Sequence, residues 1–472
     1  MKKFIVLSFV ALLVLAFGTM AFAQAKKEEP KLDFIASGFI DAQTEYYRSA
    51  TPGGANPFPT ATYAADKKHA YWETRARLKF DAIMGKSLSG TLLFEMDSSR
   101  WGDRAGGKDQ MGLLKADQAA VEIKQVYINI GVPVIPVPAT VTVGLQGINI
   151  RPHMLISTDA MGITAGIKLD PVMIRLYWSK YLEGRDATSD DVDLYGLNVD
   201  AKIGKVTVGG YGLFLNMNTY PVAFVSADYG VSPPQRADIG YYGVYADGGV
   251  GPVNINFDFI YDRGKVEGRG ASTTEIKYRG WATRLKVDFP WEKFNFGVVG
   301  AYGSGSDKNK ADKIGAFVTP PGSESAAAMG ESLVMFSSWV NRGNTGLRGG
   351  TAGSTFYEPP MGGLWYGKLY GSFKATPWYK VTLAALYIGD TTKNGNTIGN
   401  ARKADNVTLR DDKEIGWEFD LYNEFQIYKN LKYTVAGGFM TKGDGLEFYS
   451  AATGNVKPKT PWIIMSSLNY SF

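Results

Sequence analysis

Apolar and polar residues alternate one by one along most of this chain. Between residues 71 and 84, Trp72, Leu78 and Phe80 share one parity, and the charged residues share the other: Glu73, Arg75, Arg77, Lys79 and Asp81. A helix would spread these charges around its circumference, so a period of two predicts a β-strand with one apolar and one polar face. Residues 33–47 alternate in the same way.

The C-terminal residues 460–472 form a similar strand, and the chain ends on its apolar face. Leu468, Tyr470 and Phe472 share that face. An ordinary strand of a soluble sheet is one interpretation, but an exposed terminal aromatic stabilises a soluble protein little. In a membrane barrel, aromatic rings are favourable at the boundary between lipid and water. This aromatic C-terminus resembles the closing strand of bacterial outer-membrane β-barrels.

The same rhythm predicts about 18 strands of roughly ten residues, the length that a tilted strand needs to cross a bilayer. A barrel of about 16 strands is the alternative, because segments 121–130, 206–216 and 239–248 alternate poorly and strand boundaries are uncertain from sequence. The expected strands are 33–47, 71–84, 88–97, 121–130, 139–150, 163–169, 172–182, 192–203, 206–216, 239–248, 253–262, 275–289, 294–302, 364–375, 379–390, 414–428, 431–440 and 460–472.

Short and long connections alternate between these strands. The long ones are 49–69, 99–118, 147–161, 184–191, 217–236, 263–274, 303–362, 391–412 and 441–459. If both ends of the barrel sequence start in the periplasm, every long loop lies outside the cell, as expected of an outer-membrane barrel. No repeat of fixed period indicates a solenoid or propeller. We therefore predict an all-β fold: a single transmembrane antiparallel β-barrel with short periplasmic turns and long extracellular loops.

The N-terminus predicts secretion. Lys2 and Lys3 precede an apolar run at 4–17, and Ala21-Phe22-Ala23 is a small-x-small cleavage site. A membrane anchor is less well supported, since the apolar run is short for a span of about 20 residues. We expect a signal peptide at 1–23, a polar lead-in at 24–31, and a barrel at 32–472 in the outer membrane of a Gram-negative bacterium.

Composition agrees with this class of protein. The 472 residues include 27 Tyr, 25 Phe, 10 Trp and 56 Gly, which suit aromatic girdles and tight turns. There is no cysteine, which excludes disulfides, thiolate metal sites and covalent haem attachment. The net charge of +5 is small for this length and forms no cluster that suggests nucleic acid. We expect no cofactor and no metal.

Charged residues on the polar faces are the candidates for lining a pore. The basic ones are Arg75, Arg77, Lys79, Lys168, Arg175, Arg284, Lys286 and Lys368. The acidic ones are Asp41, Glu45, Glu73, Glu95, Asp97, Asp258, Glu418, Asp420 and Glu424. Opposed acidic and basic walls would create a transverse field that selects solutes. Alternatively, these groups pair with one another in a wet interior.

Two connections are candidates for narrowing the pore. The longest loop, 303–362, holds an apolar stretch at 326–340 that is long enough for a short helix. It would fold into the lumen, or instead cover the barrel mouth or contact a partner; inward folding hides its apolar residues. Loop 147–161, with Arg151, Pro152 and His153, is the second candidate.

Local motifs resemble two porin families. Residues 125–130 (QVYINI) and 141–146 (VTVGLQ) look like a hairpin of the general porins, although Leu145 stands where that family has arginine. The resemblance implies that the following loop, 147–161, folds into the pore. Residues 415–420 (IGWEFD), 431–433 (LKY) and 443–444 (GD) look like alginate-export porins.

Three functions are compatible with such a barrel. The first is a porin for passive diffusion of small hydrophilic solutes or ions. The second is an exporter component or scaffold that sheathes a partner, such as a multihaem cytochrome or a polysaccharide. The third, a barrel enzyme, needs a Ser/His or Asp/His set, but the only histidines, His69 and His153, lie in predicted loops, and no GxSxG or HExxH motif occurs. We therefore expect no enzyme. Expected partners are outer-membrane lipid, lipopolysaccharide and small solutes; a homotrimer stays open.

Overall fold

The structure is a computed structural model that describes most of the barrel sequence. It covers residues 31–48, 68–101, 110–111, 120–133, 136–183, 191–218, 235–268, 275–310, 312–320, 323, 330–336 and 361–472, with only the backbone at 68–69, 97–100, 110–111, 235 and 268. The expected signal peptide and most of the lead-in, 1–30, lie outside the described residues.

Eighteen long strands form the wall of the described molecule. They are β1 (Leu32–Arg48), β2 (Lys68–Met84), β3 (Leu88–Trp101), β5 (Glu122–Gly131), β6 (Ala139–Ile150), β7 (Ile156–Leu169), β8 (Val172–Leu182), β9 (Val192–Ile203), β10 (Val206–Met217), β11 (Gln235–Val250), β12 (Val253–Gly268), β14 (Trp281–Trp291), β15 (Phe294–Gly303), β17 (Leu364–Thr376), β18 (Tyr379–Asp390), β19 (Glu414–Tyr428), β20 (Leu431–Met440) and β23 (Trp462–Ser471).

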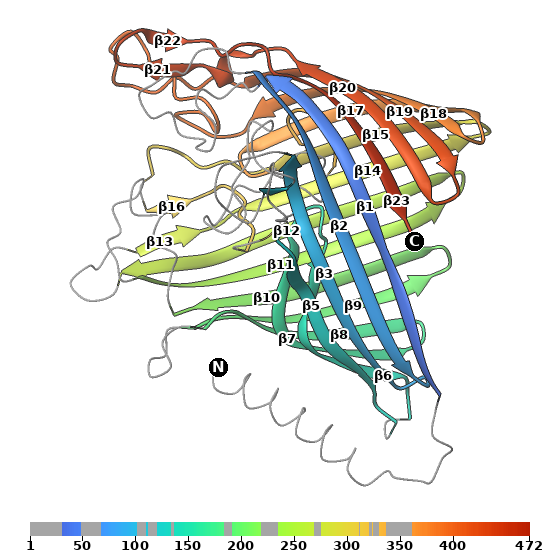
Figure 1. The fold of residues 1–472 in the computed structure, drawn as a ribbon. Coiled ribbons are helices and arrows are strands. Elements are labelled where there is room, and N and C mark those ends of the chain that lie inside the picture. The colour runs from blue at the N-terminus through green and yellow to red at the C-terminus, as the bar shows by residue number, and fades with distance from the viewer. Residues whose placement is uncertain are drawn as a thin grey trace.

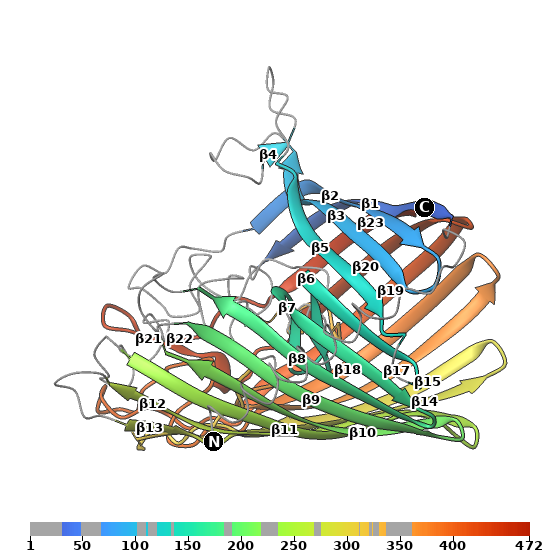
Figure 2. The ribbon, with the colours of Figure 1, turned by 90° about the horizontal axis from the view of Figure 1, so that it is seen from below.

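The wall closes on itself, as predicted. Each strand pairs antiparallel with the next, and β1 pairs with both β2 and β23 (Figures 1 and 2). Two backbone hydrogen bonds of 2.9 and 3.0 Å join Gly38 to the terminal Phe472. Closure gives every described wall strand a neighbour on both sides, which is the condition for a sheet to cross hydrocarbon.

Tight turns lie at one end of the barrel and long connections at the other (Figures 1 and 2). The long connections carry small elements of their own: β4 (Gln110–Met111), β13 (Glu275–Tyr278), β16 (Lys313–Ile314), η1 (Asp444–Leu446), β21 (Phe448–Ser450) and β22 (Gly454–Val456). We assign the tight-turn end to the periplasm, following the rule for outer-membrane barrels. No helix in the described part of the chain is long and apolar enough to span a bilayer.

The outward face is apolar and carries an aromatic girdle near each end. Near the tight turns, Phe294 stacks on Phe373 with ring centroids 4.8 Å apart. Near the long connections, Tyr387 lies 5.0 Å from Trp417. Leucines such as Leu383, which is 62% exposed in the isolated chain, lie between the two girdles. This band is the surface that lipid would cover.

The three poorly alternating segments belong to the wall, and the structure gives the reason for each. In β5, Gln125 pairs with Leu93 and Ile123 with Phe94, so Lys124 is an extra residue in a β-bulge and points inward beside Gln125. In β10 and β11 the inner faces are apolar because they contact a protein core instead of water.

Some expected boundaries were wrong. Most of the loop predicted at 147–161 is strand, since β6 and β7 pair up to Ile150 and Ile156 and only 151–155 connect them. The strand predicted at 275–289 is β13 followed by β14, in one continuous register against β12. The described part of the predicted 326–340 helix, residues 330–336, is not helical.

The outward position of Leu383 yields a test of the fold. We expect Leu383→Arg to destabilise the membrane-inserted barrel by about 2–4 kcal/mol, the cost of an arginine facing the bilayer midplane. Urea unfolding from lipid vesicles, followed by tryptophan fluorescence, would measure this loss. Val407→Arg, at a 74% exposed site in the connection after β18, is the matched control and should change the unfolding free energy by less than about 0.5 kcal/mol. Equal effects would contradict the assigned lipid face.

Candidate functional site: the divided interior of the barrel

The interior of the barrel is divided into an apolar part and a polar part. Buried apolar side chains from most of the wall pack against inward-folded residues of the connections, including Met154, Phe317, Leu333 and Phe336. None of the described core residues that are fully buried comes from β2, β3 or β5. The inner faces of these three strands are mainly polar, and we call them the polar strip.

The polar strip runs along nearly the whole of β2. Its inner side chains, from the end with long connections to the end with tight turns, are Glu73, Arg75, Arg77, Lys79 and Asp81. β3 contributes Ser89, Thr91 and Glu95, and β5 contributes Lys124, Gln125, Tyr127 and Asn129. A solute crossing along this strip would meet hydrogen-bonding groups at every level.

The buried carboxylate of Glu95 forms several ion pairs in the middle of the polar strip. Glu95 is 1% exposed and binds three cations: Arg75 at 2.6 Å, Arg77 at 2.8 Å and Lys124 at 2.9 Å. Lys124 also lies 2.9 Å from Asp159 of β7. Three cations and two carboxylates leave this cluster with a net charge of +1. The Arg77 side chain is 29% exposed, so this residue is partly accessible from the lumen.

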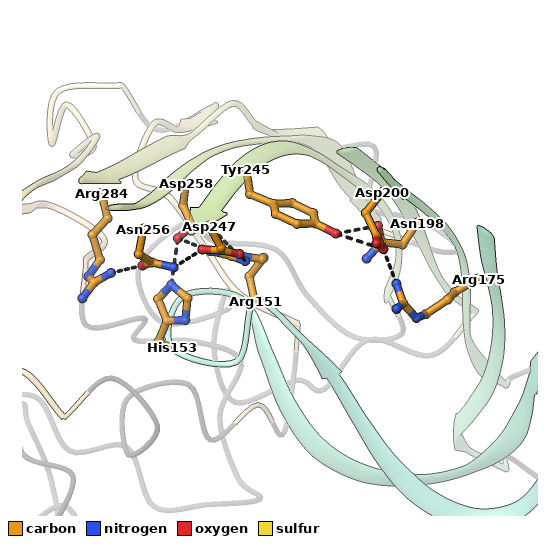
Figure 3. A network of polar contacts seen from close by, with 10 residues as sticks. All are labelled: Arg151, His153, Arg175, Asn198, Asp200, Tyr245, Asp247, Asn256, Asp258 and Arg284. Carbon is orange, nitrogen blue, oxygen red and sulfur yellow. Dashed lines mark hydrogen bonds and ion pairs between the residues drawn. The ribbon is translucent and has the colours of Figure 1, made fainter. Parts of the chain in front are cut away.

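The tip of the β6–β7 hairpin bends away from the wall and contacts β11 and β12 (Figure 3). Arg151 at this tip donates hydrogen bonds of 3.0 Å to Asp247 and 2.9 Å to Asp258. Its guanidinium lies 4.5 Å from the ring centroid of Tyr245. The backbone of Arg151 has a φ of 46°, which is uncommon for a residue with a side chain, and these contacts hold it there.

Further polar contacts extend from this tip along the inner wall (Figure 3). His153 Nε2 lies 2.8 Å from Asp258, and Asn256 links Asp247 to Arg284. On the other side, the Tyr245 hydroxyl donates to Asn198 at 3.1 Å. The tip is therefore fixed by charge and hydrogen bonds as well as by apolar packing.

Residues 330–336 of the longest connection, which we call the docked segment, lie against the inner wall opposite the polar strip. Glu331 pairs with Arg284 of β14 and Lys368 of β17, and Arg284 Nε donates to it at 3.0 Å. Burial would raise the pKa of Glu331, but the two cations outweigh burial and hold that pKa below its usual value. Glu331 is therefore ionised in the docked state.

The carboxylates of β19 bind the backbone of the docked segment. Glu418 accepts N–H bonds from Val334 at 2.6 Å and Met335 at 3.0 Å, and Asp420 accepts one from Leu333 at 3.3 Å. These bonds replace those that the irregular backbone would otherwise make to water. Both carboxylates are almost fully buried, so they anchor protein rather than face open lumen.

The two inward segments are connected to each other. The Ser323 hydroxyl donates to the Leu155 carbonyl at 2.8 Å and accepts from the Ser157 N–H at 3.2 Å. Nearby, Asp262 of β12 accepts N–H bonds from Gly280 and Val318. The hairpin tip and the described residues of the longest connection are thus in direct contact inside the barrel.

The other sequence-predicted candidates also face inward, and most pair with a neighbour. Lys79 lies 2.9 Å from Asp81 and Lys286 lies 3.6 Å from Asp288. The remaining contacts are Arg175 with Asp200, Glu424 with Lys380 and Lys432, Asp41 with Ser467, Glu45 with Tyr71, and Glu73 with Gln43. Lys168 lies on the inner face of β7 beside a tight turn. The side chains of Asp97 and His69 lie outside the described residues.

Several residues of this site were not predicted from the sequence. Lys124 was missed because the β5 bulge changes its parity. Asp159 was placed in a loop, and Asp247 lies in a strand whose inner face is largely apolar. Glu331 gave a weak signal, as the one charged residue within the apolar stretch at 326–340.

Metal binding finds no support in the described part of the chain. No group of three or more His, Asp or Glu side chains is placed there to hold an ion. The acidic side chains instead contact arginine, lysine, hydroxyl groups or backbone N–H.

Solved structures of Pseudomonas aeruginosa proteins share this architecture. OccK11 (OpdR) superposes with a TM-score of 0.53 at 12% identity, covering 94% of this chain and 98% of that chain. The outer membrane protein opdK gives 0.50 at 10% identity, and OccK8 (OprE) gives 0.50 at 11%, each covering 93% of this chain and 98% of its own. The sequence matches no described protein family and none of the curated proteins.

The fold is thus that of a bacterial outer-membrane porin: an 18-strand barrel with a lipid-facing apolar band. At these sequence identities the similarity concerns the fold alone. The interior contacts described above are observed in this chain and are not inferred from the similar structures.

The contribution of Arg151 to holding the hairpin tip against β11 and β12 can be tested by removing its guanidinium. We expect Arg151→Ala to destabilise the docked tip by about 3–5 kcal/mol, because Asp247 and Asp258 lose a buried cationic partner. Faster amide hydrogen exchange at 150–156 would report the release. Arg236→Ala is the control: Arg236 is 56% exposed in its pair with Glu267, and such a pair near the surface contributes about 0–1 kcal/mol. Unchanged exchange in Arg151→Ala would show that apolar packing alone holds the tip.

The depressed pKa of Glu331 predicts how docking depends on pH. A lowered pKa in the docked state stabilises docking at pH values above the ordinary pKa of 4.5, and this stabilisation is lost as pH falls through the lowered value. We therefore expect the part of the amide protection at 330–336 that depends on Glu331, measured as the difference between wild type and Glu331→Gln and corrected for intrinsic rates, to be lost only at strongly acidic pH. Glu331→Gln should exchange faster at neutral pH and respond less to acid. An identical acid response in both proteins would contradict this role.

Proposed function

We propose that the protein is an outer-membrane channel through which small hydrophilic solutes or ions diffuse passively. The observation that carries this proposal is the polar strip, whose inner face on β2 stays polar from Glu73 to Asp81. The apolar core and the docked segment occupy other parts of the interior. A solute path along the polar strip would be narrow and lined on one side by charges, which favours selection by charge and shape.

The hairpin tip and the docked segment are the proposed constriction. Both connections were candidates from the sequence, and both carry residues that contact the inner wall. Their packing against the inner wall narrows the space available to a solute. Most of the predicted loops 49–69 and 99–118, namely residues 49–67, 102–109 and 112–118, lies outside the described residues.

The alternative of a sheath around a partner is less favoured by the interior. A haem protein would need a lumen free of the chain's own residues, but Phe317, Leu333 and Phe336 fill part of it. An extended polysaccharide would fit a narrow polar path better than a folded protein. Co-purification of a haem protein from outer membranes would favour the sheath.

Single-channel recording tests the proposed function directly. We expect purified protein to give discrete conductance steps in planar bilayers. The folding of the purified barrel is first verified by its heat-modifiable gel mobility. If this folded protein gives no conductance steps in many reconstitution attempts, the channel proposal is overturned.

The cluster around Glu95 predicts the direction of ion selectivity. Neutralising Arg75→Gln and Arg77→Gln together changes its net charge from +1 to −1. For a permeating cation about 7 Å away in a water-like dielectric, each removed arginine charge lowers the repulsion energy by about 0.6 kcal/mol. Relative cation permeability should therefore rise roughly five- to tenfold. The reversal potential in a KCl gradient measures this change. Lys277→Gln, an outward-facing residue near the long connections, is the control and should leave the potential unchanged. A double variant with wild-type selectivity would place the ion path elsewhere.

A further inference from the structure

A polar pocket lies within the polar strip, close to the tight-turn end of the barrel. It has a volume of about 500 Å³ and is formed by the inner faces of β2, β3, β5 and β6. Gly147 and Asn149 add to its lining from β6 just before the hairpin tip bends inward. Its volume lies within the usual range of about 300–1,000 Å³ for small-molecule sites.

The charged groups of this pocket neutralise each other. Lys79 and Asp81 are the only charged residues in its described lining, and they form an ion pair of 2.9 Å. The Thr91 hydroxyl donates a further hydrogen bond of 2.6 Å to Asp81. The pocket therefore has no net charge, in contrast to the cluster around Glu95.

Uncharged hydrogen-bonding groups form most of the remaining lining. The Tyr127 hydroxyl and the Asn149 amide have no hydrogen-bond partner among the described residues. Asn129 accepts a 3.1 Å bond from Thr142 through Oδ1, which leaves its NH₂ group to donate. Gln125 donates to Asp159 at 2.6 Å, which leaves its carbonyl oxygen to accept. The pocket thus offers both donors and acceptors to a solute.

Tyr127 adds a flat apolar surface to these polar groups. Its ring comes from the inner face of β5 and is partly exposed to the pocket. An aromatic face packs well against the C–H face of a saturated ring, while its hydroxyl remains able to hydrogen-bond. This combination differs from a site for an ion, which would offer an unpaired charge of opposite sign.

We propose that this pocket is a binding subsite for a neutral polyhydroxylated solute, that is, a sugar or polyol of about one or two rings. The inference deepens the proposed function, because the pocket lies along the proposed solute path. Tyr127 packs against the sugar ring, and Asn129, Gln125 and Asn149 exchange hydrogen bonds with its hydroxyl groups. The paired Lys79 and Asp81 leave charged solutes without a counter-charge.

Equilibrium binding tests the subsite without requiring conductance. Sucrose is titrated into detergent-purified folded protein by saturation-transfer NMR, in parallel with gluconate as the anionic probe and glucosamine as the cationic probe. We expect saturable sucrose binding that is tighter than binding of either charged probe. Equal or tighter binding of gluconate or glucosamine, or no saturable sucrose binding, would overturn the proposal.

Variants of the pocket identify where sucrose binds. Tyr127→Ala and Asn129→Ala should each weaken sucrose binding by about three- to tenfold, the effect of losing one good contact. Asn295→Ala is the matched control: Asn295 of β15 also lies near the tight turns and donates to a carboxylate, Asp288, at 2.9 Å, but it is outside the pocket. Equal weakening in all three variants would overturn the assignment to this pocket.

Current block separates this inference from the proposed function. In planar bilayers, sucrose should reduce the ion current of the wild type in a saturable manner and that of Tyr127→Ala less. Conductance with no saturable sucrose binding overturns the subsite and leaves the channel intact. Sucrose binding by a protein that conducts nothing overturns the channel and leaves the binding site.

Discussion

Closure of the backbone hydrogen-bond ladder is the constraint on which this structure depends. In hydrocarbon, a strand's N–H and C=O groups have no water to bind, so each must pair with a neighbouring strand. Here the last strand, β23, completes the ring by pairing with β1, and Phe472 bonds to Gly38 at the seam. Once the ring is closed, the alternation of side chains assigns every residue of the wall to lipid or to the interior.

The interior then has to satisfy the irregular segments that fold into it. Residues 330–336 belong to no helix or wall strand, and Glu418 and Asp420 accept the N–H groups of Leu333, Val334 and Met335. Asp262 does the same for Gly280 and Val318. Glu418, Asp420 and Asp262 thus serve as acceptors for loop backbone, whereas Glu95 and Asp258, which are equally buried, pair with arginine, lysine or histidine.

Much of the wall could be predicted because strand period is a local property. The inward charges of β2 and the outward aromatics of β23 follow directly from alternation in the sequence. The bulge at Lys124 could not be predicted from alternation, because it depends on the register between β5 and β3. The apolar inner faces of β10 and β11 likewise depend on contacts with hairpin residues distant in the sequence.

The interior was harder to predict, because its contacts join segments far apart in the chain. The pairs of Arg151 with Asp247 and Asp258 span 96 and 107 residues, and no local pattern indicates them. Glu418 has the sequence pattern of a solvated inner-face charge, but its partners are backbone groups of a connection more than 80 residues away. Charge and parity predict that a side chain points inward, but not what it meets there.

The seam between β1 and β23 has a consequence for assembly. The hairpin tip and the docked segment pack against wall strands from the inside, and a completed ring would hinder their entry through either mouth. We therefore expect the hairpin tip and the docked segment to enter the barrel before or while β1 and β23 pair. A chain truncated before β23 would keep every interior contact partner except those on the final strand, yet would present two open edges to the membrane.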